Sequence, residues 1–383
     1  MNSKGKNYSQ WKAMFAITRA SLRSITRSPS AVIFTLAFPL VFIVVFGFIS
    51  GNRIRLEVGV EPGCDTTSAI YQVLRHSPAI TLITDKSGEE LKQQLIKGRV
   101  DAILKIQPTS AASSGNTIQL FVSKASREKG RFVESTLTNI IDKQNIEKLK
   151  SISERQEHNQ PGSGVWAREL SQLNVSEIEG REYKMIDFIL PGQLGFAILS
   201  AGVFGTAFVF FSLRQTLVLK RFFATPISKT FIVLGEALSR LIFQMAGSLI
   251  IILIGKFVFG FTLINGIWTV AEMLLLSALG LIVFMGFGFV VSGLAKNESV
   301  IPPLANVVTL PQFLLSGTFF PIDAFPPWLQ TICKGLPLTY LNDALRKVAF
   351  EGAGLMDISN QILVIVLWGV IIYVAAVRFF RWE

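Results

Sequence analysis

The side chains that most often do chemistry in proteins are few in this chain and are not grouped. Two histidines, His76 and His158, and two cysteines, Cys64 and Cys333, are far apart and lack neighbours that would complete a metal site. The cysteines could pair if both lie outside the cell, but two separate thiols are the favoured interpretation. We therefore expect no metal site.

Catalytic sequence motifs are also missing. A P-loop needs G-x-x-x-x-G-K-[ST], and the nearest fragment, Gly255-Lys256, is followed by Phe257 and lacks the earlier glycine. The G-x-S-x-G and H-E-x-x-H patterns do not occur. The chain is predicted not to be an enzyme and to bind no cofactor of its own.

Three ionisable residues interrupt long apolar runs. Glu236 and Arg240 are four residues apart, so on a helix they can pair on one face, in a structural or gating role. Glu272 is the best candidate for the buried carboxylate of an ion-coupled transporter. It stands only about two turns from Asn265, however, which favours a snorkelling position.

The composition is that of a membrane protein. Half of the 383 residues are hydrophobic, 16% are charged and the mean hydropathy is +0.48. Lipid accepts apolar side chains that a soluble surface could not carry. We expect an all-α polytopic membrane bundle of about six transmembrane helices. The predicted spans are 30–50, 187–211, 231–255, 265–294, 301–320 and 361–379.

The net charge of +11 lies mainly beside these runs, at 4–27, 214–229 and 378–381. Basic flanks mark the cytoplasmic side of a membrane, so both termini are predicted to be cytoplasmic. This placement argues against a nucleic-acid partner.

Residues 51–186, between the first two spans, are predicted to form an extracytoplasmic α/β domain. Ser87 followed by Glu90 is a capping box at the start of a helix. The expected strands are 54–60, 79–84, 100–106 and 117–123, and the expected helices are 66–76, 87–97 and 128–156.

Two cytoplasmic segments could contact a partner protein. Within residues 1–29, Trp11 and Phe15 share an apolar face with Met14 and Thr18, next to a basic stripe. This amphipathic helix could be a simple anchor in the headgroup region or an interface. Residues 213–229 form a basic link, read either as a short coupling helix or as an ordinary loop.

The link and the residues after it resemble the ABC-2 type exporter permeases. That family shows an A/T-T-P-[LIV]-S pattern, here Ala224-Thr225-Pro226-Ile227-Ser228. Arg214 and Gln215 stand where the family often has acidic residues. Further matching segments are Gly286-Phe287-Gly288 with Ser292-Gly293, Leu315-Ser316-Gly317-Thr318-Phe319-Phe320-Pro321, Phe325-Pro326-Pro327-Trp328, Leu336-Pro337-Leu338-Thr339-Tyr340 and Asp343-Ala344-Leu345-Arg346.

The resemblance implies an exporter permease in a bacterial inner membrane. Its partners would be an ABC ATPase, which carries ATP and Mg, and a second permease copy or paralogue. It also implies short re-entrant helices at 322–350. Pro321, Pro337, Asp343 and Arg346 are the predicted structural or gating residues of this region, and Asp343 and Arg346 are expected to pair. The implied ATPase-coupling interface is Trp11, Phe15, Leu217, Lys220, Arg221, Phe223, Thr225 and Pro226.

Phenylalanines suggest a hydrophobic or amphipathic substrate such as a lipid, a lipid-linked compound or a drug. Phe204, Phe208, Phe284 and Phe287 are the candidate substrate path, although lipid-facing side chains give the same count. The alternative function is an ion-coupled secondary transporter. A membrane-anchored structural or signalling protein would leave the five later spans unexplained.

Overall fold

The computed structural model describes residues 9–48, 56–77, 80–96, 98–108, 116–123, 126–156, 170–178, 184–215, 226–322 and 325–379. The chain divides into two compact units. One consists of Met1–Ser50 and Lys184–Glu383, and the other of Gly51–Tyr183. The smaller unit is thus inserted into the sequence of the larger one.

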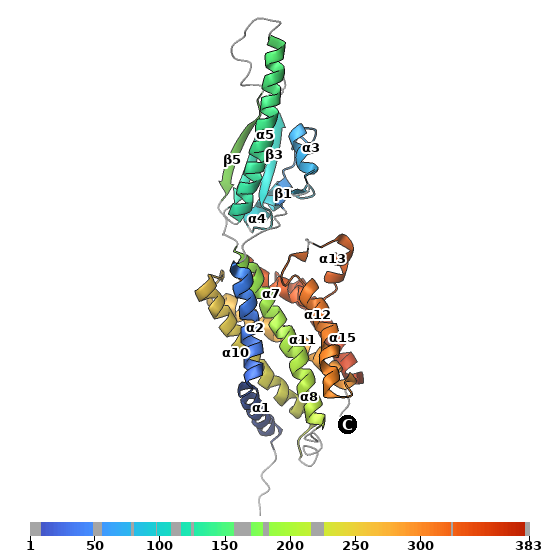
Figure 1. Cartoon of the computed structure of the whole chain (residues 1–383). Coiled ribbons are helices and arrows are strands. Elements are labelled where there is room, and N and C mark those ends of the chain that lie inside the picture. The colour runs from blue at the N-terminus through green and yellow to red at the C-terminus, as the bar shows by residue number, and fades with distance from the viewer. Residues whose placement is uncertain are drawn as a thin grey trace, which may run out of the picture. The chain divides into compact units, whose positions relative to one another are not determined.

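The smaller unit is built on a mixed sheet, of which β1, β3 and β5 are labelled in Figure 1. The sheet has five strands in the order β2-β1-β3-β4-β5. β1 pairs in parallel with β2 and β3, β3 pairs antiparallel with β4, and β4 pairs in parallel with β5. The strands are β1 (Leu56–Val60), β2 (Ile80–Ile83), β3 (Ala102–Pro108), β4 (Asn116–Ser123) and β5 (Gln172–Ile178).

Helices cover both faces of this sheet. On one face, α3 (Ala69–Arg75) and α5 (Arg127–Gln156) bury apolar side chains that include Leu74 and Leu137. On the other face, α4 (Gly88–Ile96) buries Leu91 and Leu95 against the sheet. The alternation of strands and helices places one apolar core on each side of the sheet.

The predicted capping box of α4 is confirmed. The Ser87 N–H donates to Glu90 Oε2 at 3.2 Å, and the Glu90 N–H donates to Ser87 Oγ at 3.3 Å. The sequence did not predict β5. Its residues, QLNVSEI, are mostly exposed and do not alternate clearly between apolar and polar, so the period that marks a strand is weak.

The larger unit is helical. It contains α1 (Gln10–Thr26), α2 (Pro29–Phe48), α7 (Met185–Ser200), the π-helix η2 (Ala201–Gly205), α8 (Thr206–Gln215), α10 (Lys229–Phe259) and α11 (Ile267–Leu294). The 3₁₀ turn η3 (Glu298–Val300) then leads into α12 (Ile301–Leu315), α13 (Pro327–Cys333), α14 (Pro337–Arg346), the π-helix η5 (Lys347–Glu351) and α15 (Ser359–Phe379). The large apolar core lies mainly among α7, α10, α11, α14 and α15.

Four helical stretches of the described residues are long and apolar enough to cross a membrane. They are Met185–Gln215, Lys229–Phe259, Ile267–Leu294 and Ser359–Phe379. These agree with four of the six predicted spans. The first predicted span coincides with α2, a helix of 20 residues that contains the apolar stretch Thr35–Val45.

The predicted span at 301–320 is not confirmed at its full length. α12 has 15 residues, which at about 1.5 Å per residue is shorter than a hydrocarbon core of about 30 Å. The helix ends because the chain turns at Gly317, whose φ of +69° suits glycine. Residues 316–320 have no regular structure, and the short helices α13 and α14 follow.

Candidate functional site

The predicted coupling interface is partly within the described residues. Trp11 and Phe15 are on α1, and Pro226 lies three residues before the first residue of α10. Leu217, Lys220, Arg221, Phe223 and Thr225 lie outside the described residues. The described part of the site therefore consists of α1 and of the residues where the link 213–229 joins α10.

α1 packs lengthwise on the beginning of α10 (Figure 1). Met14 and Thr18 are buried in this contact, and Thr18 Oγ1 donates hydrogen bonds to the carbonyls of Met14 and Gly235, both at 3.0 Å. A Cβ on Gly235 would lie 3.0 Å from the Met14 carbonyl. The missing side chain therefore lets the two helices approach closely.

One turn further along α1, a hydroxyl meets the acid inside α10. Ser21 Oγ donates to Glu236 Oε2 at 2.6 Å, and only 7% of Glu236 is exposed. A buried carboxylate needs hydrogen-bond donors, and α1 supplies one. Glu236 therefore belongs to the contact between α1 and α10.

Glu236 and Arg240 share a helix face and lie near enough for their opposite charges to attract each other, but within the described ranges no ion pair or hydrogen bond joins the two. The Glu236 carboxylate is bonded to Ser21 instead, while the Arg240 guanidinium lies beside Gly205 of η2, where a Cβ would crowd its Nη1. Spacing on one helix could not reveal a competing donor from another helix.

At the beginning of α1, the Gln10 side chain reaches the end of the link. Its Nε2 donates to the Pro226 carbonyl at 2.6 Å, and its Oε1 accepts from the Ser228 N–H at 3.0 Å. Ile227, between them, is buried together with Ile232 of α10 in a small apolar cluster. The other members of this cluster are Ala13, Ile17, Leu213 and Phe231.

The part of the predicted apolar face of α1 next to Met14 and Thr18 is exposed. Trp11 and Phe15 are 61% and 58% exposed, although the ring of Trp11 also meets that of Phe231 edge to face, with 5.2 Å between centroids. The predicted apolar face is thus divided: Met14 and Thr18 pack on α10, while Trp11 and Phe15 remain available. Four exposed cations lie on the same helix: Lys12, Arg19, Arg23 and Arg27.

The predicted pair of Asp343 and Arg346 has other partners. Asp343 forms an ion pair with Lys347 at 2.9 Å and accepts a hydrogen bond from Gln361 at 2.7 Å. Arg346 donates to the carbonyls of Phe188 and Gly317, and its guanidinium lies 3.7 Å from the centre of the Phe188 ring. Both residues tie α14 to other elements, which their spacing did not predict.

The two predicted prolines of this region lie at breaks in the helices. Pro337 is the first residue of α14, the position where a missing N–H costs nothing. Pro321 is exposed in the irregular segment between α12 and α13. Short helices therefore occupy much of the predicted re-entrant region, while its orientation in a membrane stays a prediction.

The four predicted substrate-path phenylalanines belong to the packed interior. Phe284 is 1% exposed, and a Cβ on Gly202 would lie 2.6 Å from its Cβ. Phe204, Phe208 and Phe287 are partly buried against the same core. The role of these four rings in a substrate path stays a prediction.

A different aromatic cluster was missed by sequence reasoning. Phe196 of α7 and Phe313 of α12 have ring centres 4.0 Å apart, and rings of α2 and of residue 319 complete the group: Phe38, Phe42 and Phe319. These rings come from three distant parts of the chain. No local sequence pattern could have brought them together.

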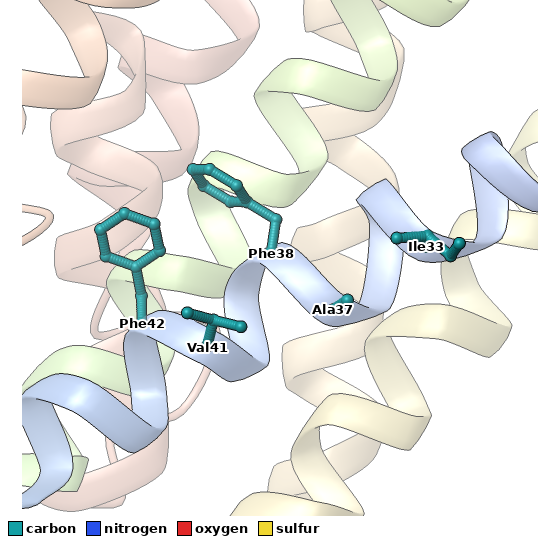
Figure 2. A pocket seen from close by; sticks show the side chains of 5 residues that line it. All are labelled: Ile33, Ala37, Phe38, Val41 and Phe42. Atoms are coloured by element: carbon teal, nitrogen blue, oxygen red, sulfur yellow. The ribbon is translucent and has the colours of Figure 1, made fainter.

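Beside this cluster α2 carries an apolar hollow of about 370 Å³ (Figure 2). In Figure 2, Phe38 and Phe42 project from the same side of the helix. Hydrocarbon side chains alone line the hollow: Ile33, Ala37, Phe38, Val41 and Phe42. Such a surface can accept an acyl chain or another apolar group, but it offers no polar partner.

Among the described residues, no three histidine, cysteine, aspartate or glutamate side chains are close enough to hold a metal ion. Cys64 and Cys333 are free thiols. The polar side chains of the larger unit described above join helices to one another.

The chain is similar to known transporter proteins. A family model described as ABC-2 family transporter protein matches residues 29–378. The probable multidrug ABC transporter permease YbhS of Escherichia coli (strain K12) is 20% identical over 351 residues, which cover 89% of each chain. The linearmycin resistance permease protein LnrN of Bacillus subtilis (strain 168) is 22% identical over 389 residues, covering 97% of this chain and 100% of LnrN.

A eukaryotic relative matches a shorter region. ABC transporter G family member 20 of Dictyostelium discoideum is 27% identical over 197 residues, which are 51% of this chain and 26% of that protein. The family match, by contrast, runs from the start of α2 to the end of α15 and includes all four long apolar helices. This membrane protein therefore belongs to the ABC-2 family of transporter proteins.

Proposed function

We propose that this chain is the permease subunit of an ATP-driven ABC exporter, and that ATP and Mg bind to a separate ATPase chain. The observation that carries the proposal is the family match over residues 29–378 in a chain whose sequence has no P-loop motif. Two relatives that match most of their own length are named as permeases, which supports a permease chain that is separate from the ATPase chain.

The proposed substrate is hydrophobic or amphipathic: a lipid, a lipid-linked compound or a drug. One relative is named as a multidrug permease and another as a linearmycin resistance permease. The apolar hollow on α2 and the neighbouring aromatic cluster offer the kind of surface that an apolar group would contact. Export, from the cytoplasm or the inner leaflet, is the proposed direction.

The proposed topology has six spans in a bacterial inner membrane. α2 and the segment 301–320, which begins with α12, would be the two spans beyond the four long helices, and both termini would be cytoplasmic because basic residues flank those ends. The smaller unit, with its sheet, would lie on the outer side. A second permease copy or a paralogue, together with membrane lipids, would complete the transmembrane path.

The proposed ATPase-docking surface combines the link 213–229 with the exposed side of α1. Trp11 and Phe15 would bury apolar surface against the ATPase, and Lys220 and Arg221 would meet acidic groups on it. The contact of Gln10 with residues 226 and 228 supports a shared surface, because it holds α1 beside the end of the link.

A pull-down tests this surface. Leu217→Asp, or Lys220→Glu together with Arg221→Glu, should abolish capture of the ATPase while the chain still inserts into the membrane. Charge reversal at Arg75 and Lys92, exposed residues of the smaller unit, is the matched control and should leave capture unchanged. If the link variants capture the ATPase as well as the control does, the link is a passive loop and the docking proposal is wrong.

A further inference from the structure

We infer that Gln10 is a positioning residue that fastens the end of the link 213–229 to α1. As a result, α1, residues 226–228 and the first two turns of α10 move as one body. The mechanical consequence for transport rests on the proposed function, but the fastening itself can be tested without it.

The first support is the geometry of the Gln10 amide. A primary amide has one acceptor oxygen and one donor nitrogen, and Gln10 uses each on the same short stretch of backbone. The partners are the Pro226 carbonyl, at 2.6 Å, and the Ser228 N–H, at 3.0 Å. Rotation or sliding of this stretch against α1 would break both bonds at once.

The backbone held by Gln10 is also the start of a long helix. Ser228 is the N-cap residue of α10, but its own side chain makes no capping hydrogen bond. The Ser228 N–H is bonded to Gln10, 218 positions earlier. α1 therefore fixes where α10 begins and the direction in which the link enters it.

The second support is the packing around the amide. Ile227 is 9% exposed and Ile232 is fully buried, with Ala13 and Ile17 of α1 packed against them. Burial of these side chains opposes separation of the two elements, while the directional bonds of Gln10 fix their register.

The third support is that α1 holds α10 at two later points. Thr18 donates to the Gly235 carbonyl, and Ser21 donates to Glu236. Residues 10, 18 and 21 thus contact the link end and α10 over about 16 Å of helix. Three separated points prevent α1 from pivoting about any one of them.

Gln10 differs from the other two points in its partner. Thr18 and Ser21 hold α10 itself, whereas Gln10 holds the backbone through which the link enters α10. A force applied to the link would consequently be transmitted to α10 by two routes, through the covalent backbone and through the contact with α1. Without Gln10, the link end would be joined to α1 mainly by non-directional apolar contacts.

Pulsed electron paramagnetic resonance on the permease–ATPase complex in lipid nanodiscs tests the fastening. Spin labels are placed by Arg23→Cys on α1 and Ser228→Cys at the end of the link, both exposed positions, after Cys64 and Cys333 are replaced by alanine. The tested variant is Gln10→Met, which keeps the side-chain length and loses both hydrogen bonds. The control is Gln72→Met, which removes one glutamine hydrogen bond in the smaller unit.

We expect one narrow distance distribution that is the same with and without ATP in the unsubstituted complex and in Gln72→Met. Gln10→Met should broaden it at least twofold. A distance that changes on ATP binding in the unsubstituted complex, or a Gln10→Met distribution as narrow as the control, would overturn the inference.

A second label pair, Lys256→Cys with Leu363→Cys on α15, measures transmission. ATP should shift this distance in the unsubstituted complex, and Gln10→Met should reduce the shift at least twofold. An unreduced shift overturns the positioning role. If the unsubstituted chain captures no ATPase, the proposed function fails, and the first pair measured without nucleotide still decides whether Gln10 fastens the link.

Discussion

Arg346 and Asn342 supply hydrogen bonds to backbone that no longer belongs to a helix. After α12 ends, Asn342 Nδ2 donates to the Ser316 carbonyl at 3.0 Å, and Arg346 donates to the carbonyl of Gly317. Arg346 also donates to the Phe188 carbonyl of α7 at 3.1–3.2 Å. One side chain thus fixes the irregular segment against a long apolar helix.

Replacing Arg346 by methionine should destabilise the larger unit. Two carbonyls would lose a charged donor, at a cost of about 2–3 kcal/mol, and methionine would keep only the contact with the Phe188 ring. The thermal unfolding midpoint in nanodiscs should fall by several degrees, whereas Lys334→Met, at an exposed position, should change it little. Equal midpoints for the two variants would contradict this assignment.

In the smaller unit, the side chain of Asp101 likewise connects separate elements. It is 2% exposed, accepts the Glu57 N–H at 2.9 Å and pairs with Lys129 at 3.2 Å, so it joins β1 to α5. Burial raises the pKa of Asp101 above its ordinary value, against the opposing effect of Lys129. The folded state therefore favours the protonated acid.

The sign of the pH dependence follows from that direction. Stability contributed by Asp101 is present below its unfolded pKa of about 3.9 and is lost as the pH rises through the raised folded value. Asp101→Asn should remove this dependence and keep the bond from Glu57. The free energy of unfolding of Asp101→Asn, compared with that of the native chain, should increase as the pH rises from about 3.9 to the raised folded pKa of Asp101, and should then stay constant.

Hydrogen exchange of the β1 and β3 amides in the full chain measures the effect at each pH. Asp101→Ala should lose about 1–3 kcal/mol of protection at neutral pH, because the Glu57 N–H is left without its partner. A difference between the native chain and Asp101→Asn that does not vary with pH would show that the buried acid is not the cause.

Residue pairs show where prediction from sequence fails. Spacing correctly placed Glu236 and Arg240 on one helix, and Asp343 and Arg346 on another, but the bonds of Glu236, Asp343 and Arg346 go to residues that spacing did not indicate. The actual partner of Glu236 is 215 positions away. Such contacts depend on how helices pack, which local periodicity does not contain. Gln10 was missed for the same reason.

At the scale of elements, close helix contacts depend on glycines. A Cβ on Gly288 of α11 would lie 2.7 Å from the Val203 carbonyl and 2.8 Å from that of Gly202, both in η2. These are backbone atoms, which cannot turn aside as a side chain can. The contact between α11 and η2 therefore requires a residue without a side chain.

Gly288→Ala should consequently be much more damaging than Gly369→Ala on α15, where the nearest atom to the new Cβ is a Val283 methyl at 3.1 Å. Overpacking against rigid neighbours costs about 1–3 kcal/mol or more. Thermal unfolding of the two variants in the same detergent should show a clearly lower midpoint for Gly288→Ala. The reverse order would mean that α11 and η2 are not packed this way.

Elements were predicted correctly where a pattern of neighbouring residues in the sequence marks them. Hydropathy located the four long helices, and the capping box gave the start of α4. The early end of α12 was missed because an apolar run of 20 residues gives the same hydropathy whether or not Gly317 turns the chain. The aromatic cluster of Phe38, Phe196 and Phe313 arises only when three elements meet.

At the scale of the whole molecule, the proposed topology predicts which residues lie on each side of the membrane. Lys92 of the smaller unit and Ser228 before α10 are exposed, so each can be replaced by cysteine in a chain without Cys64 and Cys333. A membrane-impermeant maleimide added to intact cells should label position 92 and should not label position 228. Labelling of position 228 under these conditions would reverse the proposed topology.

The central claim is that this family member is the membrane part of an ATP-driven exporter and does not hydrolyse ATP itself. The most direct test is phosphate release, measured in nanodiscs for the purified chain alone, for the partner ATPase alone and for their complex. The chain alone should release phosphate at the background rate, and the complex should exceed the ATPase alone. Sustained hydrolysis by the chain alone, or a complex no more active than the free ATPase, would contradict the account.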